Sequence, residues 1–211
     1  MAKELNNLEN KTQFRADILD QYFGICDLGQ SVENYYKNKK VLVTGGAGAI
    51  GSNLIIGLSK LIGSGGLVVV LDNLSAIKDD EAWNITPLAN VLFVKGDVRC
   101  NKDLKRVFRE KPSIVFHLAA FFANQNSVDY PESSAEVDVL GLVKLLEYST
   151  LSGVQRFVYA SSGCAIYGSS PSLPVEEDYI SLKLTTPYQI NKMAGEMYCN
   201  YYLHQFGLNT I

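Results

Sequence analysis

The sequence has few of the features that mark secreted, membrane or nucleic-acid-binding proteins. It has no CxxC pair, so neither a zinc site nor a disulfide framework is expected, and a reducing cytoplasm fits best. No apolar run is long enough to cross a bilayer, and the polar amino-terminal residues contain no apolar signal core. Its 19 basic residues are outnumbered by 22 acidic ones and form no stripe, so nucleic acid is not the expected partner. The four cysteines are Cys26, Cys100, Cys164 and Cys199.

A chain of 211 residues, 47% hydrophobic and 19% charged, is instead typical of one globular domain with a full core. Residues 1–38 precede the first strong strand, and we expect a helical extension there rather than a separate domain. Apolar residues recur at helical spacing, which predicts that one stripe packs on the main body. These residues are Phe14, Ile18, Leu19, Tyr22 and Phe23.

In the main body, residues 39–211, short β-branched runs alternate with amphipathic stretches, a pattern typical of a parallel α/β sheet. The expected strands are 41–45, 67–72, 91–97, 113–119 and 156–162, and the expected helices are 49–61, 101–110, 132–151 and 187–205. This alternation predicts a three-layer, doubly wound parallel sheet. The final residues, GLNTI, are typical of the opening of a further strand rather than the end of a domain.

A glycine-rich turn, TGGAGAIGSN, directly follows the first expected strand and runs into the first helix of the main body. Gly46, Gly48 and Gly51 satisfy GxGxxG, while Gly45, Gly48 and Gly51 satisfy GxxGxxG. Glycine lets the backbone turn tightly and approach a pyrophosphate, whose charge is met by free N–H groups and the helix dipole. The turn therefore predicts a dinucleotide site. The alternative is a turn that serves only helix–strand packing.

Asp72 ends the second expected strand, where a carboxylate can accept hydrogen bonds from the diol of an adenosine ribose. The same carboxylate would repel a 2′-phosphate, and no Arg lies between Asn73 and Glu81 to attract one. The sequence therefore predicts NAD rather than NADP. If the glycine turn serves only packing, Asp72 is simply a solvated loop acid.

Tyr188 and Lys192 lie four residues apart on the last expected helix, with Thr186 as its N-cap and Pro187 in its first turn. Their side chains then share one face. An ammonium beside a phenol stabilises the phenolate and moves the tyrosine toward the pKa of a useful base. This pattern alone is common, and an exposed Lys beside a packing Tyr is the alternative.

The fifth expected strand ends in YASSGCAIYG, and its carboxyl end opens onto the same sheet edge as the glycine turn. A hydroxyl from Ser161 or Ser162 could there bind a substrate oxygen while Tyr188 takes its proton. A buried serine that satisfies a strand end is the alternative.

Six successive motifs together resemble those of a known family: TGGAGAIGSN, LDNLS, KGDV, HLAA, YASSGCAIYG and PYQINK. In this order they are similar to the motifs of extended short-chain dehydrogenase/reductases, specifically the NAD-dependent nucleotide-sugar epimerase/dehydratase family. The resemblance covers about residues 40–211 and implies a Rossmann fold. It also implies that Tyr188 is the base, and that Lys192 binds the nicotinamide ribose and lowers the tyrosine pKa.

The resemblance further implies a cofactor site made of the glycine turn and the ends of successive strands. Its residues would be Gly45, Gly48, Ala49, Ile50 and Gly51 at the pyrophosphate, Asp72 and Asn73 at the ribose, Asp97 and Val98 at the adenine, and Leu118, Ala119, Ala120 and Ser161 along the remaining channel.

The implied reaction oxidises a nucleotide sugar, usually a UDP-sugar at C4, and reduces it again on the opposite face, which regenerates NAD. Gly163 stands where the family most often has its catalytic Ser or Thr, so we take Ser162 as the catalytic hydroxyl. Cys164 and Ala165 follow and supply no acid for loss of water, which favours an epimerase over a 4,6-dehydratase. A 4-keto reductase is a further alternative. The family often has Asn where Asp138 stands.

Two observations leave open a second class of function, one without catalysis. Almost none of the family's carboxyl-terminal substrate lobe is present in this sequence, and Gly163 departs from the family pattern. The alternative is an NAD-binding fragment or module without independent catalysis. Members of the family commonly dimerise through two long helices, which implies a homodimer through residues 132–151 and 187–205.

Overall fold

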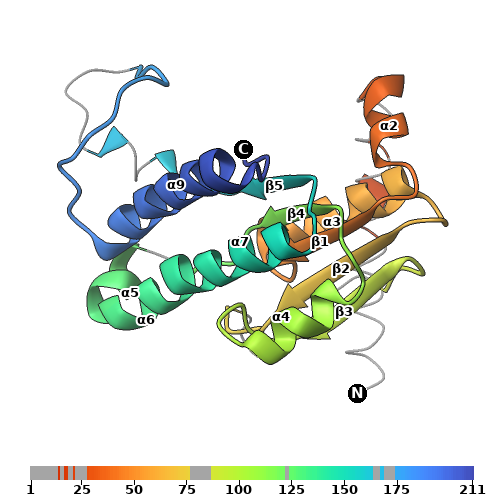
Figure 1. Ribbon diagram of the computed structural model, residues 1–211, viewed down its shortest axis with the longest axis horizontal. Coiled ribbons are helices and arrows are strands. Elements are labelled where there is room, and N and C mark those ends of the chain that lie inside the picture. The colour runs from red at the N-terminus through yellow and green to blue at the C-terminus, as the bar shows by residue number, and fades with distance from the viewer. Residues whose placement is uncertain are drawn as a thin grey trace.

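The computed structural model describes residues 28–76, 87–121, 124–163, 167–168 and 174–211, together with Phe14, Asp17, Ile18 and Gln21. Its centre is a five-stranded parallel sheet in the order β3-β2-β1-β4-β5 (Figure 1). The strands are β1 (Lys40–Thr44), β2 (Leu67–Asp72), β3 (Val91–Lys95), β4 (Ile114–His117) and β5 (Arg156–Tyr159). The strand order confirms the predicted doubly wound α/β fold.

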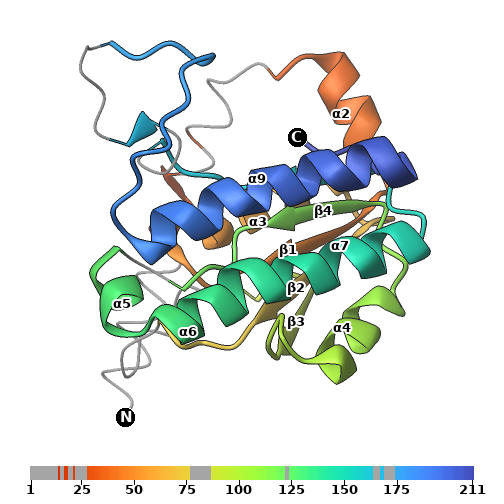
Figure 2. The same ribbon diagram turned by 60° about the vertical axis from the view of Figure 1, so that its left-hand side comes forward.

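Helices cover both faces of the sheet and give it three layers (Figure 2). One face packs on α3 (Ala49–Ile62), and α2 (Gln30–Tyr36) lies against α3. The other face is covered by α4, α7 and α9, with α5, α6 and the π-helix η2 beside the first turns of α9. The bounds are α4 (Asn101–Phe108), α5 (Asn124–Asp129), α6 (Pro131–Ala135), η2 (Glu136–Gly141), α7 (Leu142–Leu151) and α9 (Pro187–Phe206).

The core lies in two clusters, one on each face of the sheet. Val41 and Val43 of β1 point toward Ile55 and Leu58 of α3, while Leu42 between them points to the face of α4, α7 and α9. Because both faces are covered, the central strands are apolar at almost every position rather than alternating with polar residues. Because all strand pairs are parallel, the carboxyl ends of the five strands lie at one edge, where the predicted site residues lie.

Two residues of the predicted amino-terminal stripe are described, and neither packs as the sequence predicts. Phe14 is 68% exposed and Ile18 is 48% exposed, so the predicted packing of these two residues is wrong. Leu19, Tyr22 and Phe23 lie outside the described residues. The extension instead contacts the main body through α2, whose Tyr35 and Tyr36 pack against the cluster on the α3 face.

The predicted helix of residues 132–151 is three successive helical segments, α6, η2 and α7. The helix α2 lies within the helical extension predicted for residues 1–38, whereas α5, with 6 residues and too few turns for a clear apolar period, was missed. The strands β3, β4 and β5 end at Lys95, His117 and Tyr159, earlier than predicted. The residues that follow them leave the sheet and form its carboxyl edge.

Residues 209–211 continue the sheet beyond β5. The Phe157 N–H donates to the Asn209 carbonyl at 2.8 Å, and the Ile211 N–H donates to the Phe157 carbonyl at 2.9 Å. Thr210 thereby forms a parallel bridge with Phe157. This pairing confirms the strand-like character predicted for the last residues of the sequence.

Candidate active site

The glycine turn connects β1 to α3 at the carboxyl edge of the sheet. Gly45 has a φ of +72°, and a Cβ there would lie 2.6 Å from the Ala119 backbone nitrogen after β4. A Cβ on Gly51, in the first turn of α3, would overlap the Gly45 carbonyl oxygen and lie 2.7 Å from the Gly46 Cα. Both positions require glycine because the turn, the helix and the end of β4 meet without space for a side chain.

The start of α3 offers backbone donors to an anion. Gly48 is the N-cap, and no side chain among the described residues caps the helix. The first N–H groups of a helix have no intrahelical acceptor, and here they belong to Ala49, Ile50 and Gly51. A Cβ on Gly48 would meet only the Gly45 carbonyl oxygen, at 3.3 Å, so the outer side of the turn is open to a ligand. These features fit a bound pyrophosphate.

Asp72 ties the end of β2 to the glycine turn. Its Oδ2 accepts a hydrogen bond from the Ala47 N–H at 2.9 Å, and its Oδ1 accepts one from the Leu74 N–H at 2.8 Å. A carboxylate has about four acceptor positions, so each oxygen retains one for a further donor. The carboxylate is therefore fixed in place and able to accept hydrogen bonds from ribose hydroxyls.

Asp97, after β3, lies beside Asn73 and Arg99. The Asn73 side-chain amide donates to Asp97 Oδ2 at 3.0 Å, and Arg99 forms an ion pair with the same oxygen at 2.9 Å. The hydrogen bond from the Arg99 side chain lowers the pKa of the Asp97 carboxyl to about 2. Arg99 also pairs with Glu136 of η2 at 3.0 Å. Val98 is 5% exposed with its side chain in the core, so only its backbone remains to border an adenine.

Thr44 and His117 form a buried pair at the ends of β1 and β4. Thr44 Oγ1 lies 2.7 Å from His117 Nδ1 and accepts a hydrogen bond from the Ala119 N–H at 3.4 Å. The imidazole is neutral because burial lowers its pKa to about 3. His117 therefore has a structural role, as the buried partner of Thr44. The partly buried residues after β4 are Leu118, Ala119 and Ala120.

Lys192 is 4% exposed and reaches from α9 to the carboxyl end of β5. Its Nζ donates to the Ala160 carbonyl at 2.8 Å. The same nitrogen lies 4.9 Å from the centre of the Tyr159 ring and 5.8 Å from the centre of the Tyr188 ring. Burial lowers the pKa of this ammonium, and the nearby Asp138 carboxylate opposes that shift. The structure therefore brings Tyr188 and Lys192 together at the predicted edge.

The start of α9 is built as the sequence predicts. Thr186 is the N-cap, its hydroxyl accepts from the Gln189 N–H, and the Gln189 side chain accepts from the Thr186 N–H, which together make a capping box. Pro187 occupies the first turn. These local interactions place Tyr188 in the first turn of the helix, in a partly buried position.

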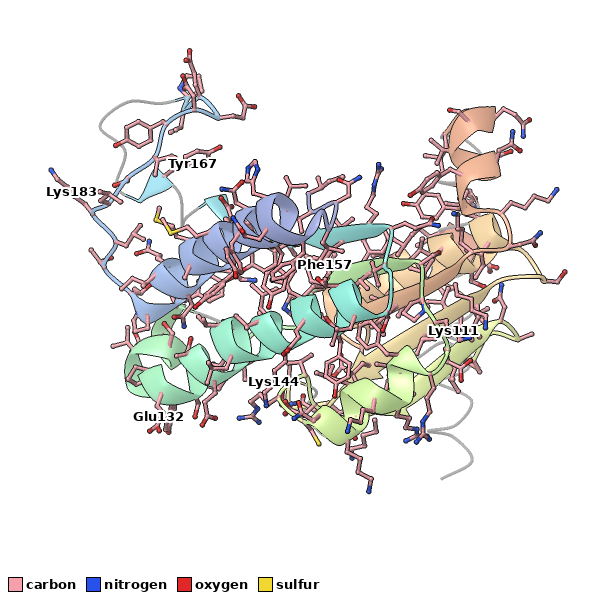
Figure 3. The ribbon with its side chains drawn as sticks, viewed as in Figure 1. Lys111, Glu132, Lys144, Phe157, Tyr167 and Lys183 are labelled. Carbon is pink, nitrogen blue, oxygen red and sulfur yellow. The ribbon has the colours of Figure 1, made fainter. Side chains whose placement is uncertain are left out.

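The two candidate serines follow Ala160 directly. Ser161 is exposed and Ser162 is partly buried. A Cβ on Gly163 would lie 3.6 Å from the Tyr167 ring, an ordinary contact, so the position has room for a side chain. Figure 3 shows Tyr167 and Lys183 at the end of the molecule where α9 begins, and Lys111 at the opposite end. Cys164 and Ala165 lie outside the described residues.

Asp138 has a place in the site that the sequence did not reveal. It is 2% exposed, and its Oδ1 accepts from the Phe121 N–H at 2.8 Å while its Oδ2 accepts from the Ser134 hydroxyl at 3.1 Å. Ser134 in turn accepts from the Asn191 amide at 3.0 Å. The only sequence signal was the departure from the family's usual Asn, which did not indicate that a buried carboxyl group interacts electrostatically with Lys192.

Within the described part of the chain, no group of three or more His, Cys, Asp or Glu side chains is placed to hold a metal ion. None of the helices described there combines the length and the apolar character needed to span a membrane.

Residues 41–211 match the family model described as the NAD dependent epimerase/dehydratase family. A curated UDP-glucose 4-epimerase from Mycolicibacterium smegmatis is 39% identical over 171 residues, which are 81% of this chain and 53% of the relative. Among solved structures, an epimerase from Methanothermobacter thermautotrophicus is 50% identical with a TM-score of 0.80, over 86% of this chain and 52% of that one. The Thermus thermophilus UDP-glucose 4-epimerase in complex with NAD is 38% identical with a TM-score of 0.71, over 81% and 53%. The chain spans about half the length of these relatives.

Proposed function

Because the chain belongs to the NAD dependent epimerase/dehydratase family, we propose that it binds NAD and epimerises a nucleotide sugar, a UDP-sugar at C4. The observation that carries the proposal is the position of Lys192. Its ammonium is held on the Ala160 carbonyl at the end of β5, beside the ring of Tyr188. A buried cation next to a phenol at the ligand edge of a doubly wound sheet fits a base for alcohol chemistry.

The cofactor would lie along the carboxyl edge from β3 to β5. The N–H groups at the start of α3 would bind the pyrophosphate, and Asp72 and Asn73 would bind the adenosine ribose. The Asp72 carboxylate disfavours a 2′-phosphate, which supports NAD over NADP. When bound, NAD supplies the acceptor that takes a hydride from the sugar and returns it. Beside the adenine would lie Asp97 and the Val98 backbone, and along the channel Leu118, Ala119, Ala120 and Ser161.

The side chains at the end of β5 and the start of α9 would move the proton. Tyr188 would take the proton of the sugar hydroxyl during oxidation and return it during reduction. Lys192 would stabilise the phenolate by its charge and donate to the nicotinamide ribose hydroxyls. Ser162 would donate a hydrogen bond to the same sugar oxygen. Tyr188 would thus act as base in the oxidation and as acid in the reduction, so its protonation state is restored after each turnover.

The substrate class is supported by the relatives, whose names include UDP-glucose 4-epimerases. A 4,6-dehydratase or a 4-keto reductase is the alternative within enzymes. An NAD-binding module without independent catalysis is the alternative of another class, and the observation that favours it is that the chain covers about half of each relative. We further propose a cytoplasmic homodimer that acts on the free nucleotide sugar.

Proton NMR time courses with UDP-, GDP-, CDP- and dTDP-sugars test this function. We expect interconversion of C4 epimers of a UDP-sugar without net consumption of NAD, and its loss in Tyr188→Phe. A 4-keto-6-deoxy product indicates a dehydratase, and consumption of added NADPH indicates a reductase. Bound NAD with no turnover of any sugar supports the module, whereas undiminished turnover by Tyr188→Phe contradicts the assignment of the base.

A further inference from the structure

The first turn of α9 is tied to α5 by side chains that no sequence motif singles out. Ser127 is 0% exposed, and its Oγ accepts a hydrogen bond from the Tyr188 backbone N–H at 3.0 Å although the two residues are 61 positions apart. The Ser127 hydroxyl donates to the Asn124 carbonyl at 2.6 Å. The Thr186 hydroxyl donates to Asn124 Oδ1 at 3.0 Å. Two residues of α5 thus contact the start of α9, one through the Thr186 side chain and the other through the Tyr188 backbone.

The contact matters because the Tyr188 N–H is one of the first donors of α9, which have no acceptor within the helix. The N-cap Thr186 satisfies the Gln189 N–H through its hydroxyl. A buried backbone donor needs a partner, and here that partner comes from another helix. The orientation of the first turn of α9 is therefore fixed by α5 and not only by its own cap.

We propose that Ser127 is a positioning residue for Tyr188. Its hydroxyl fixes the tyrosine backbone, and with it the start of the phenol side chain, relative to the carboxyl edge of the sheet. The segment containing α5 leaves that edge directly after β4, where Leu118, Ala119 and Ala120 would line the cofactor (Figure 2). Ser127 therefore connects the cofactor side of the site to the base. The catalytic part of this proposal rests on the proposed function, because it takes Tyr188 as the base.

The test compares Ser127→Ala with Ser149→Ala. Ser149 is a matched control because it is also 0% exposed and its hydroxyl donates to a backbone carbonyl, that of Leu145, at 2.7 Å within α7. Amide hydrogen exchange of Tyr188, measured by NMR, reads the anchor without any turnover. We expect at least roughly tenfold faster exchange in Ser127→Ala and none of this change in Ser149→Ala.

The same variants are assayed for epimerisation with the full-length chain. A misplacement of about 1 Å costs on the order of a hundredfold in rate, so kcat should fall by roughly ten- to a hundredfold in Ser127→Ala. KM for the nucleotide sugar and the affinity for NAD should stay unchanged, because both hydrogen bonds of the hydroxyl are to the protein backbone. Ser127→Thr, which retains a hydroxyl, should restore slow exchange and most of kcat.

Unchanged exchange at Tyr188 in Ser127→Ala would overturn the anchor. Faster exchange with unchanged kcat would overturn the positioning role, and an equal loss of kcat in Ser149→Ala would show a general effect of stability. If the unaltered chain turns over no sugar, the proposed function fails, while the exchange measurement still decides whether Ser127 holds the tyrosine backbone.

Discussion

Gly163 stands one residue after the proposed hydroxyl of Ser162, at the position that most often carries that hydroxyl in the family. A Cβ at Gly163 would make only an ordinary 3.6 Å contact with the Tyr167 ring. Removing a hydrogen-bond donor to the reacting oxygen costs roughly a hundredfold in rate, so we expect that loss of kcat in Ser162→Ala. Adding Gly163→Ser to that variant should recover at least about tenfold. Steady-state kinetics of the two variants, with matched melting temperatures, measure both effects.

This rescue experiment distinguishes two explanations for the glycine at position 163, where the family most often has its catalytic hydroxyl. Recovery of kcat means that a hydroxyl at either position reaches the sugar oxygen. If Ser162→Ala retains full kcat, Ser162 is not the catalytic hydroxyl, and a double variant that stays inactive places the requirement at residue 162 alone.

Asp97 makes a pH-dependent contribution to stability. Its folded-state pKa, about 2, lies below the ordinary value of 3.8 because Arg99 donates to the carboxylate. An acid with a lowered folded-state pKa stabilises the fold above its unfolded-state pKa and loses that contribution as the pH falls toward 2. After allowance for solvent screening, Asp97→Asn should lower the free energy of unfolding by about 1 kcal/mol at pH 7 and by less near pH 2.5. Urea unfolding at both pH values measures the difference, and a pH-independent difference would contradict it.

At the scale of elements, different glycines of the turn between β1 and α3 serve packing and ligand binding. A Cβ on Gly51 would overlap the Gly45 backbone, whereas one on Gly48 would meet only the Gly45 carbonyl oxygen at 3.3 Å. Gly51→Ala should therefore push α3 off the turn, cost about 1–3 kcal/mol of stability and abolish NAD binding. Gly48→Ala should retain nearly all of the stability and weaken NAD binding, because its methyl group occupies the open side of the turn.

Thermal unfolding without cofactor and calorimetric titration with NAD distinguish the two effects. Equal loss of stability in both variants would show that Gly48 also serves packing. Unchanged NAD affinity in Gly48→Ala would place the pyrophosphate elsewhere.

Local signals made several elements predictable. The bounds of β2 were predicted fully, and α3 and α9 each extend one residue beyond the prediction, because apolar period and capping residues such as Thr186 are written in consecutive positions. The short helix α5 and the π-helix η2 were not predictable in this way. They are held by contacts between distant segments, such as Ser127 with Tyr188 and Asp138 with Phe121.

In the candidate site, too, features signalled by local sequence were predictable and features that depend on the fold were not. Gly45, Asp72, Tyr188 and Lys192 were predicted as site residues because the proposed chemistry needs those residue types at fixed spacings. The acceptor of the Lys192 ammonium, the Ala160 carbonyl, could not be found, since every residue has a carbonyl and only the fold selects one. The buried side chain of Val98 was hidden for the same reason, because which face of a turn becomes core depends on η2, where Gly141 leaves room for it.

At the scale of the whole molecule, α9 and α7 lie side by side on one face (Figure 2). Several apolar side chains on this face are exposed. On α9 the side chains of Ile190, Met197 and Tyr201 are 53%, 61% and 49% exposed, at spacings that place them opposite the buried residues of the helix. Leu140 of η2 and Leu151 of α7 are 57% and 80% exposed. Exposed apolar patches of this kind mark interaction surfaces, and an isologous contact between two copies would cover both stripes at once.

We therefore expect sedimentation at twice the 23.3 kDa mass of the chain. Met197→Glu places a charge on the exposed stripe without touching the core, so it should raise the dimer dissociation constant by at least roughly thirtyfold, the equivalent of about 2 kcal/mol. Leu182→Glu is the matched control, because Leu182 is 83% exposed but precedes α9 and lies off the stripe. Dissociation of both variants would point to a nonspecific effect of charge. A monomer of the unaltered chain at high concentration would mean that the two stripes do not pair with a second copy. In that case the free energy gained in the isologous contact would be smaller than the cost of the translational and rotational freedom lost on association.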